Sequence, residues 1–363
     1  MTGPAAPAPG EVTDGEALVD LLLALLAVPS PTGDEGALAT WIAERYAGEW
    51  VRREGNSLVV GEVDPHRPQV LLVGHTDTVP ATPADRQPRR EGDRVVGRGA
   101  SDMKSGLAVA MAAFEDPRLR AGPYGVRLVA YAGEEGPHAG NELGPLLDAV
   151  GDLTDADLAV VLEPTDGAVE LGCLGVLNAH VVVPGRAAHA ARPWFGANAL
   201  AHAAPLLAQL GEPSYRDVEV DGLVYREVIT PTQAWTDNAR NVVPDRLTVN
   251  LNVRFAPDKG LDAAEAHVRE VVRDRGTVEV VDRAPPAAPR RDDPLVARFV
   301  DAVGAEVRPK QAWTDVARFA ERGVPALNFG PGATAQAHQA GEWVATPALG
   351  AALDRLRRFL AAP

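Results

Sequence analysis

Short apolar runs that end in a polar side chain recur along this chain, and they limit the folds open to it. The runs at 70–73, 126–132 and 158–162 have the length of strands buried on both faces. Segments with helical periodicity lie between them, and this alternation predicts a three-layer α/β domain. We expect helices at 14–27, 34–47, 104–115 and 141–149, and strands at 50–53, 57–63, 69–74, 125–132 and 157–162.

The middle of the chain has a different pattern. Strand-like and helical stretches follow one another in the order β-α-β-β-α-β, which is typical of a ferredoxin-like α+β unit. Residues 247–255 alternate apolar and polar side chains, so one face of this second sheet is expected to meet water. The α/β pattern then resumes, with a helix expected at 346–361. We therefore predict one domain in two parts, 11–174 and 285–363, around an inserted domain at 175–284.

Charge and cysteine content exclude several classes of protein. The formal charge is -15 over 363 residues, which argues against nucleic acid or an anionic membrane as a partner. The single cysteine, Cys173, excludes an internal disulfide framework and fits a reducing compartment. The apolar run 18–28 is too short to span a bilayer, and its acidic upstream flank is unlike a secretory signal. A helix that starts at a capping box of Thr13 and Glu16 fits better, and we expect a cytoplasmic protein.

Histidine and carboxylate side chains stand just after the apolar runs or in glycine-rich loops. Ligands of α/β sheets gather at the carboxyl ends of the strands, where such side chains would converge. One imidazole and one carboxylate from each side could hold two divalent ions, which would activate a shared water. Each residue alone is a weak signal, because single histidines and Glu-Glu pairs are common on surfaces; the combination is much harder to attribute to chance. The candidates are His75, Asp77, Asp102, Glu134, Glu135, Glu163 and His338.

The tandem Glu134-Glu135 and the neighbouring Asp77 suggest a division of labour. One of the two glutamates can bind metal while the other takes a proton from water. Asp77, two positions after His75, can accept from the second ring nitrogen of that histidine. Other hydrolytic or nucleotide-binding patterns are missing: the sequence has no Gly-x-Ser-x-Gly elbow and no Walker A motif.

The motifs that carry these residues resemble those of the dinuclear zinc aminoacylase/carboxypeptidase family. The matching stretches lie at 74–80, 97–106, 133–136, 163–165 and 337–338, and their order and spacing agree over nearly the whole chain. The resemblance implies two zinc ions per subunit, with cobalt or manganese able to substitute. By resemblance, His75 and Glu163 bind one ion, Glu135 and His338 bind the other, Asp102 bridges them and Glu134 is the general base. The resemblance also implies a cis peptide bond after Asp102.

The inserted domain is similar to the lid and dimerisation domain of that family. By resemblance, His189 reaches the active site of a partner subunit in a homodimer and stabilises the oxyanion, whereas a surface histidine is the plainer alternative. Asn241, Arg254 and Gly330 match positions that contact substrate. An arginine fork suits a carboxylate, although Arg254 could also form only a salt bridge across its own sheet.

Within the family, three segments resemble members from high-GC bacteria that hydrolyse N-succinyl-LL-2,6-diaminopimelate. They lie at 189–196, 220–227 and 313–319. The usual Arg-Arg-Gly-Ser segment is replaced here by Cys173-Leu174-Gly175-Val176, so we expect Arg192 or Arg186 to bind the succinyl carboxylate instead. The implied substrate is a small anionic acyl-amino acid. Acetylornithine deacetylase, N-acyl-amino-acid deacylase and metallo-carboxypeptidase activities stay open, as does a non-catalytic scaffold of the same fold.

Overall fold

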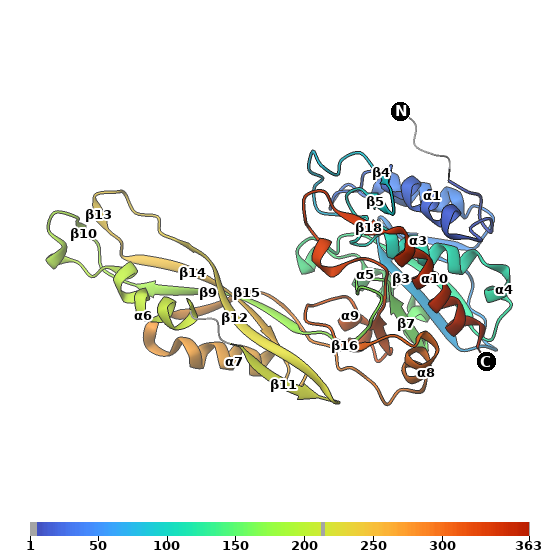
Figure 1. Ribbon diagram of the computed structural model, residues 1–363. Helices are drawn as coiled ribbons and strands as arrows, with labels where there is room; N and C mark the ends of the chain where they lie inside the picture. The colour runs from blue at the N-terminus through green and yellow to red at the C-terminus, as the bar shows by residue number, and fades with distance from the viewer. Residues whose placement is uncertain (1–5, 212–214, 363) are drawn as a thin grey trace. The chain divides into compact units, whose positions relative to one another are not determined.

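The computed structural model describes residues 6–211 and 215–362, which form two compact units (Figure 1). The first unit combines the chain up to Gly172 with Pro289–Arg308 and the part from Asp315 onward. The second unit contains Cys173–Ala288 together with Pro309–Thr314, a short return that the sequence pattern did not indicate. The predicted roles of the inserted unit as lid and dimerisation domain stay predictions.

An eight-stranded mixed sheet forms the centre of the first unit. Its middle strands β6, β3, β7 and β17 run parallel, whereas β1, β2 and β8 pair antiparallel. The strands β3, β6 and β7 are buried along their whole length, as their apolar runs predicted. In sheet order the strands are β1 (Val51–Glu54), β2 (Ser57–Val60), β6 (Gly125–Tyr131), β3 (Gln69–His75), β7 (Leu158–Val161), β17 (Ala326–Asn328), β8 (Val169–Leu171) and β16 (Val307–Pro309).

Helices cover this sheet on both sides, which confirms the predicted three-layer arrangement. One layer consists of helices that pack against one another and, through α3 and α4, against the sheet: α1 (Gly15–Leu26), α3 (Lys104–Glu115), α4 (Pro117–Arg120), α8 (Pro294–Val303) and α10 (Thr346–Ala361). Figure 1 shows α5 (Leu143–Ala149) and α9 (Val316–Glu321) on the other side, and α2 (Gly36–Arg45) contacts β2. Among the residues described, none of the helices has both the length and the apolar character needed to cross a bilayer.

Two local features differ from the sequence prediction. Helix α1 is capped by Asp14, whose carboxylate accepts the N–H of Ala17, so the predicted capping box at Thr13 is wrong. An aspartate at this position satisfies the same unpaired N–H groups of the first turn. A small antiparallel sheet of β4 (Arg89–Glu91), β5 (Arg94–Val96) and β18 (Trp343–Ala345) was not predicted. It joins the chain just before Asp102 to the chain just after His338.

Four strands and two helices of the second unit, β9, α6, β12, β14, α7 and β15, follow the predicted order β-α-β-β-α-β, whereas the strands β10, β11 and β13 were not predicted. Its sheet runs β11-β12-β14-β9-β15 and is antiparallel throughout. Alternate residues of β9 and β14 are buried against α6 and α7, and the other face is partly exposed, as the alternation predicted. The elements are β9 (Gly175–Pro184), β10 (Ala188–His189), α6 (Ala199–Gly211), β11 (Arg216–Val220), β12 (Leu223–Trp235), β13 (Val242–Val243), β14 (Arg246–Phe255), α7 (Leu261–Val272) and β15 (Thr277–Ala284).

Candidate metal centre

Three adjacent parallel strands bring the first candidate residues to one edge of the sheet. His75 is the last residue of β3, and its neighbours β6 and β7 lead into the loops that carry Glu134, Glu135 and Glu163. Because the strands are parallel and fully buried, their carboxyl ends meet at the same edge and their next side chains face a common space. His75 and Glu163 are themselves buried.

Asp102 and His338 come to this edge from two loops. Asp102 lies two residues before α3, and the peptide bond between Asp102 and Met103 is cis, which confirms that prediction. His338 follows a short 3-10 turn at Thr334–Gln336, and its side chain is about half exposed, at 55%. The site thus combines residues from before and after the inserted unit.

Ligand atoms of these residues lie close enough to share metal ions. Asp102 is central, because its two carboxylate oxygens face two different histidines: Oδ1 is 3.3 Å from Nε2 of His75, and Oδ2 is 3.8 Å from Nε2 of His338. His338 Nε2 is also 2.7 Å from Oε2 of Glu135. Three sets have ligand atoms within 4.8 Å of one another: His75-Asp102-Glu163, His75-Glu134-Glu135 and Asp102-Glu135-His338.

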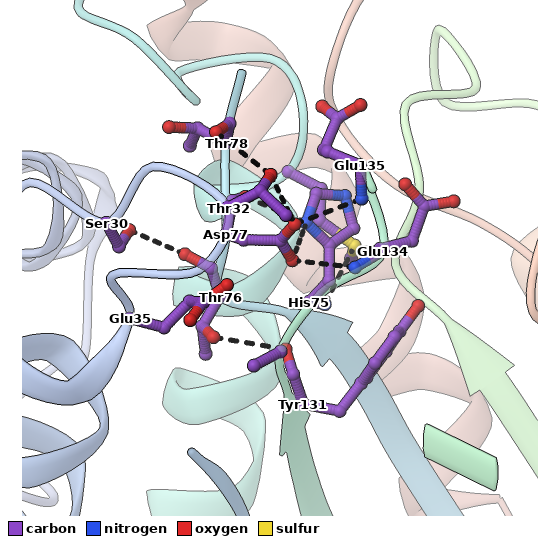
Figure 2. Close-up of polar contacts among 12 residues, drawn as sticks. Ser30, Thr32, Glu35, His75, Thr76, Asp77, Thr78, Tyr131, Glu134 and Glu135 are labelled. Atoms are coloured by element: carbon purple, nitrogen blue, oxygen red, sulfur yellow. Dashed lines mark hydrogen bonds and ion pairs between the residues drawn. The ribbon is translucent and has the colours of Figure 1, made fainter. Parts of the chain in front are cut away.

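Asp77 organises the loops of the site (Figure 2). His75 Nδ1 donates to the main-chain oxygen of Asp77 (2.9 Å), and the Asp77 carboxylate is farther away, at 3.6 Å. That carboxylate instead accepts the N–H groups of Glu134 and Glu135, both at 3.0 Å, and the hydroxyl of Thr32 at 3.0 Å. Asp77 therefore fixes the ring of His75 through its backbone and the two glutamates through its side chain. Sequence reasoning had assigned it only to the histidine.

Protonation of the metal-free site shows how strongly it favours added positive charge. Although burial opposes it, the hydrogen bond to Asp102 and the nearby carboxylate of Asp77 raise the pKa of His75 well above its ordinary value. Burial, and then the charge of Asp102, raise the pKa of Glu135 to about 8. Burial also raises the pKa of Glu134, with a further contribution from Glu163. Although burial alone would raise it, the nearby imidazole of His75 and hydrogen bonds from the N–H groups of Glu135 and Glu134 lower the pKa of Asp77 to about 2.

The donor set fits divalent cations. Protons offset the crowding of carboxylates in the metal-free site, and a cation can take over that part by displacing them. Imidazole nitrogen and carboxylate oxygen are the ligands that zinc takes in catalytic sites. His75 Nδ1 carries the proton, because a carbonyl oxygen only accepts, so Nε2 is the nitrogen that can bind an ion.

The other candidate residues belong to different surroundings. Gly330 donates its N–H to Thr165 (3.0 Å), and a side-chain carbon there would lie 2.3 Å from the main-chain oxygen of Glu163. Close packing thus accounts for this glycine, and its predicted contact with substrate stays a prediction. The remaining five lie in the second unit and keep their predicted roles as predictions: Arg186, His189, Arg192, Asn241 and Arg254.

Within the second unit these five residues form two groups. The pairing of β10 with β13 places His189 opposite Val242, and Asn241 accepts the N–H of Ala190 (2.8 Å). Arg186 and Arg192 are in the same loop region as His189, whereas Arg254 is near the far end of β14. Arg246 is the first residue of β14 and lies nearer to Asn241. Arg254 is eight residue steps farther along the strand, which corresponds to about 26 Å.

Comparisons with known proteins show which family the chain belongs to. Residues 71–362 match the profile of peptidase family M20/M25/M40. A succinyl-diaminopimelate desuccinylase from Corynebacterium glutamicum is 38% identical over 88% of this chain and 89% of its own. A relative from Mycobacterium tuberculosis, to which the same activity is provisionally assigned, is 37% identical over 94% of this chain and 97% of its own. The chain therefore belongs to peptidase family M20/M25/M40, as the motifs indicated.

Solved structures of known proteins share the fold of this chain. A tripeptidase from Staphylococcus aureus has a TM-score of 0.78 at 19% identity and covers 96% of this chain and 98% of its own. A dinuclear metal-binding peptidase of family M20 from Bacillus subtilis has a TM-score of 0.68 at 15% identity, over 96% of this chain and 97% of its own. At these identities the likeness shows the fold, and the chemistry is argued from the residues.

Proposed function

We propose that this chain is a zinc-dependent amidohydrolase that splits N-succinyl-LL-2,6-diaminopimelate into succinate and LL-diaminopimelate. The observation that supports it most is Asp102, with one carboxylate oxygen toward His75 and the other toward His338. A carboxylate shared in this way suits two ions, and the two relatives that are 37% and 38% identical carry this activity in their names. The reaction belongs to the synthesis of diaminopimelate and lysine in the cytoplasm.

Each candidate ligand has a proposed place. His75 and Glu163 would hold one ion, Glu135 and His338 would hold the other, and Asp102 would be shared by both. Two bound ions supply a polarised carbonyl and a more acidic water. The side chain of Glu134 accepts the proton from that water and returns it to the leaving amine as the amide breaks. Asp77 keeps the backbone of Glu134 in place through a 3.0 Å hydrogen bond.

Two copies of the chain are proposed to build each complete site. His189 lies beyond the end of β14 that starts at Arg246, and Arg254 lies about 26 Å along the strand from Arg246, which exceeds the reach of one small substrate. If both contact the same substrate, one of them must come from a partner subunit. We therefore assign His189 and Asn241 to the partner's site, where His189 stabilises the oxyanion, and we assign Arg254 to the substrate carboxylate in its own subunit.

Mixing two inactive variants tests this exchange. Glu134→Gln lacks the base and His189→Ala lacks the oxyanion contact, so each homodimer is expected to be inactive. A heterodimer carries one site with both residues intact, and after equal mixing and subunit exchange we expect about a quarter of wild-type activity by random pairing. Mass measurement of the heterodimer is the control. If heterodimers form but turnover is not restored, His189 does not act in the active site of the partner subunit.

A purified-protein assay tests the substrate. With zinc supplied, kcat/KM for succinyl-diaminopimelate is expected to exceed that for acetylornithine or small dipeptides by at least about 100-fold, because the second carboxylate of the succinyl group makes charge-assisted hydrogen bonds. If acetylornithine or a dipeptide were hydrolysed equally fast or faster, the chain would be assigned that activity instead. No turnover with any amide, with both ions bound, would favour a scaffold.

The same assay tests which arginines bind the carboxylate of the succinyl group. Changing Arg186 and Arg192 together to Gln is expected to raise KM for the succinylated substrate, with a smaller effect on kcat. Arg269→Gln is the matched control, because Arg269 is paired with Glu265 on α7. An unchanged KM in the double variant would show that neither arginine binds the succinyl carboxylate.

A further inference from the structure

One buried carboxylate, that of Glu342, holds the turn that presents Asp102. Its Oε1 accepts the N–H groups of Ser101 (2.7 Å) and Asp102 (2.8 Å), and its Oε2 accepts the N–H of Gly99 (2.9 Å). The side chain is 1% exposed, so water does not compete for these bonds. Glu342 also comes four residues after His338, which places its backbone in the second loop of the site.

Arg98 extends this contact to the loop that follows His338. Its Nη1 donates to Oε2 of Glu342 (3.0 Å), and its Nη2 donates to Asp85 (3.0 Å) and to the main-chain oxygen of Gln339 (3.2 Å). Asp85 in turn accepts the N–H of Gly341 (2.8 Å). The planar guanidinium can make these bonds in fixed directions, which a lysine could not reproduce. The backbone on the C-terminal side of His338 is therefore tied to the turn that carries Asp102.

The two loops carry ligands whose spacing matters for one ion. Asp102, Glu135 and His338 form a set of ligand atoms within 4.8 Å of one another. Metal–ligand distances tolerate only about 0.2 Å of variation, so a small shift of either loop would open this set. None of the hydrogen bonds described for Glu342 or Arg98 goes to a ligand side chain, so their effect would pass through the backbone.

We propose that Glu342 is a positioning residue that sets the spacing between Asp102 and His338, and thereby the affinity of the ion that these two share with Glu135. The inference rests on the proposed metal centre but not on the identity of the substrate. The other ion would also use Asp102, but its remaining ligands, His75 and Glu163, are fixed at the ends of β3 and β7 and do not need this contact. Loss of Glu342 should therefore affect the two ions unequally.

Glu342→Gln tests this inequality by zinc titration against a chromophoric chelator. Glutamine keeps the shape of the side chain, but its NH2 group would face N–H donors at one end. Changes to groups that orient metal ligands typically lower metal affinity by about 10- to 100-fold, and we expect a loss of this size for the zinc ion that Glu135 and His338 hold. The affinity for the other ion should fall by a smaller factor, because only Asp102 among its ligands would be displaced.

Glu115→Gln is the matched control for a buried glutamate that is paired with an arginine. Glu115 accepts from Arg45 (2.7 Å) and from the hydroxyl of Tyr46 (2.7 Å), neither of which is a candidate site residue. This variant should lose stability and keep both zinc affinities. If Glu342→Gln also keeps both, or weakens both ions equally, Glu342 is only a structural residue and the inference is wrong.

Arg98→Lys covers the case in which Glu342→Gln does not fold. A single ammonium group cannot bridge Glu342 and Asp85 at once, so the same ion should weaken by a smaller factor. Unequal loss supports the inference, and equal or no loss overturns it. A wild-type protein that binds two zinc ions but does not hydrolyse succinyl-diaminopimelate would end the proposed function alone. A wild-type protein that binds fewer than two would end this inference.

Discussion

Glu134→Gln is expected to lower kcat by about three orders of magnitude or more, at the upper end of what a general base contributes, while both zinc ions stay bound. The amide cannot take a proton from water, although it has nearly the shape of the carboxylate. Its backbone should stay in place, because the N–H of Glu134 is held by Asp77 and not by its own side chain. Turnover and zinc content per chain are measured on the same preparation.

Zinc content has to be measured because the geometry also allows Glu134 to be a metal ligand. Ligand atoms of Glu134 and Glu135 both lie within 4.8 Å of His75, so Glu134 could itself be a ligand. If Glu134→Gln loses one zinc ion as well as its activity, Glu134 is a metal ligand. If the variant keeps activity within tenfold of wild type, Glu134 is not the general base. Glu115→Gln again controls for the change of a glutamate in the same unit.

Gly106→Ala is expected to destabilise the protein by about 3 kcal/mol and to weaken zinc binding. A side-chain carbon at this third residue of α3 would lie 1.9 Å from the main-chain oxygen of Leu162, so the helix or the strand end must move. Leu162 directly precedes Glu163, and α3 begins two residues after Asp102. The same shift would therefore separate two candidate ligands.

The matched control is Gly350→Ala in the middle of α10. Beyond the adjacent residues and the backbone of α10 itself, no atom of the described residues lies within 4 Å of the added carbon. Alanine favours a helix over glycine by about 1 kcal/mol, so stability should be unchanged or slightly higher. Free energies of unfolding are compared by denaturant titration of the metal-free proteins, and zinc affinities by chelator competition. If Gly106→Ala behaved like Gly350→Ala, the close approach of α3 to Leu162 would not be what sets the distance from Asp102 to Glu163.

The sequence predicted those parts of the site that depend on strand ends. His75 and Glu163 follow runs of apolar residues that can only be buried strands, so their convergence follows from the sheet itself. The family motifs added Asp102 and His338, whose loops have no periodic pattern. The division of Asp102 between two histidines is a matter of side-chain direction, which spacing along a chain does not determine.

Residues that act through the backbone were the ones missed. Glu342 is a single glutamate near the end of a loop, and nothing in its neighbourhood distinguishes it from a solvated surface residue. Its partners Gly99, Ser101 and Asp102 are about 240 positions away in the sequence. The sequence pointed to Asp77 but not to the bonds that its carboxylate makes, which go to the N–H groups of Glu134 and Glu135. These bonds depend on the three-dimensional course of two loops, which the sequence pattern does not give.

The position of β17 has a consequence for biosynthesis. This strand lies between β7 and β8 in the sheet, yet it is made after the whole second unit. A ribosome adds roughly 5–20 residues per second, so the gap between β7 and β8 stays open for about 8–33 seconds after Val161 is made. During that interval two apolar strand edges are unprotected, and a chain truncated before Ala326 is expected to aggregate or be degraded.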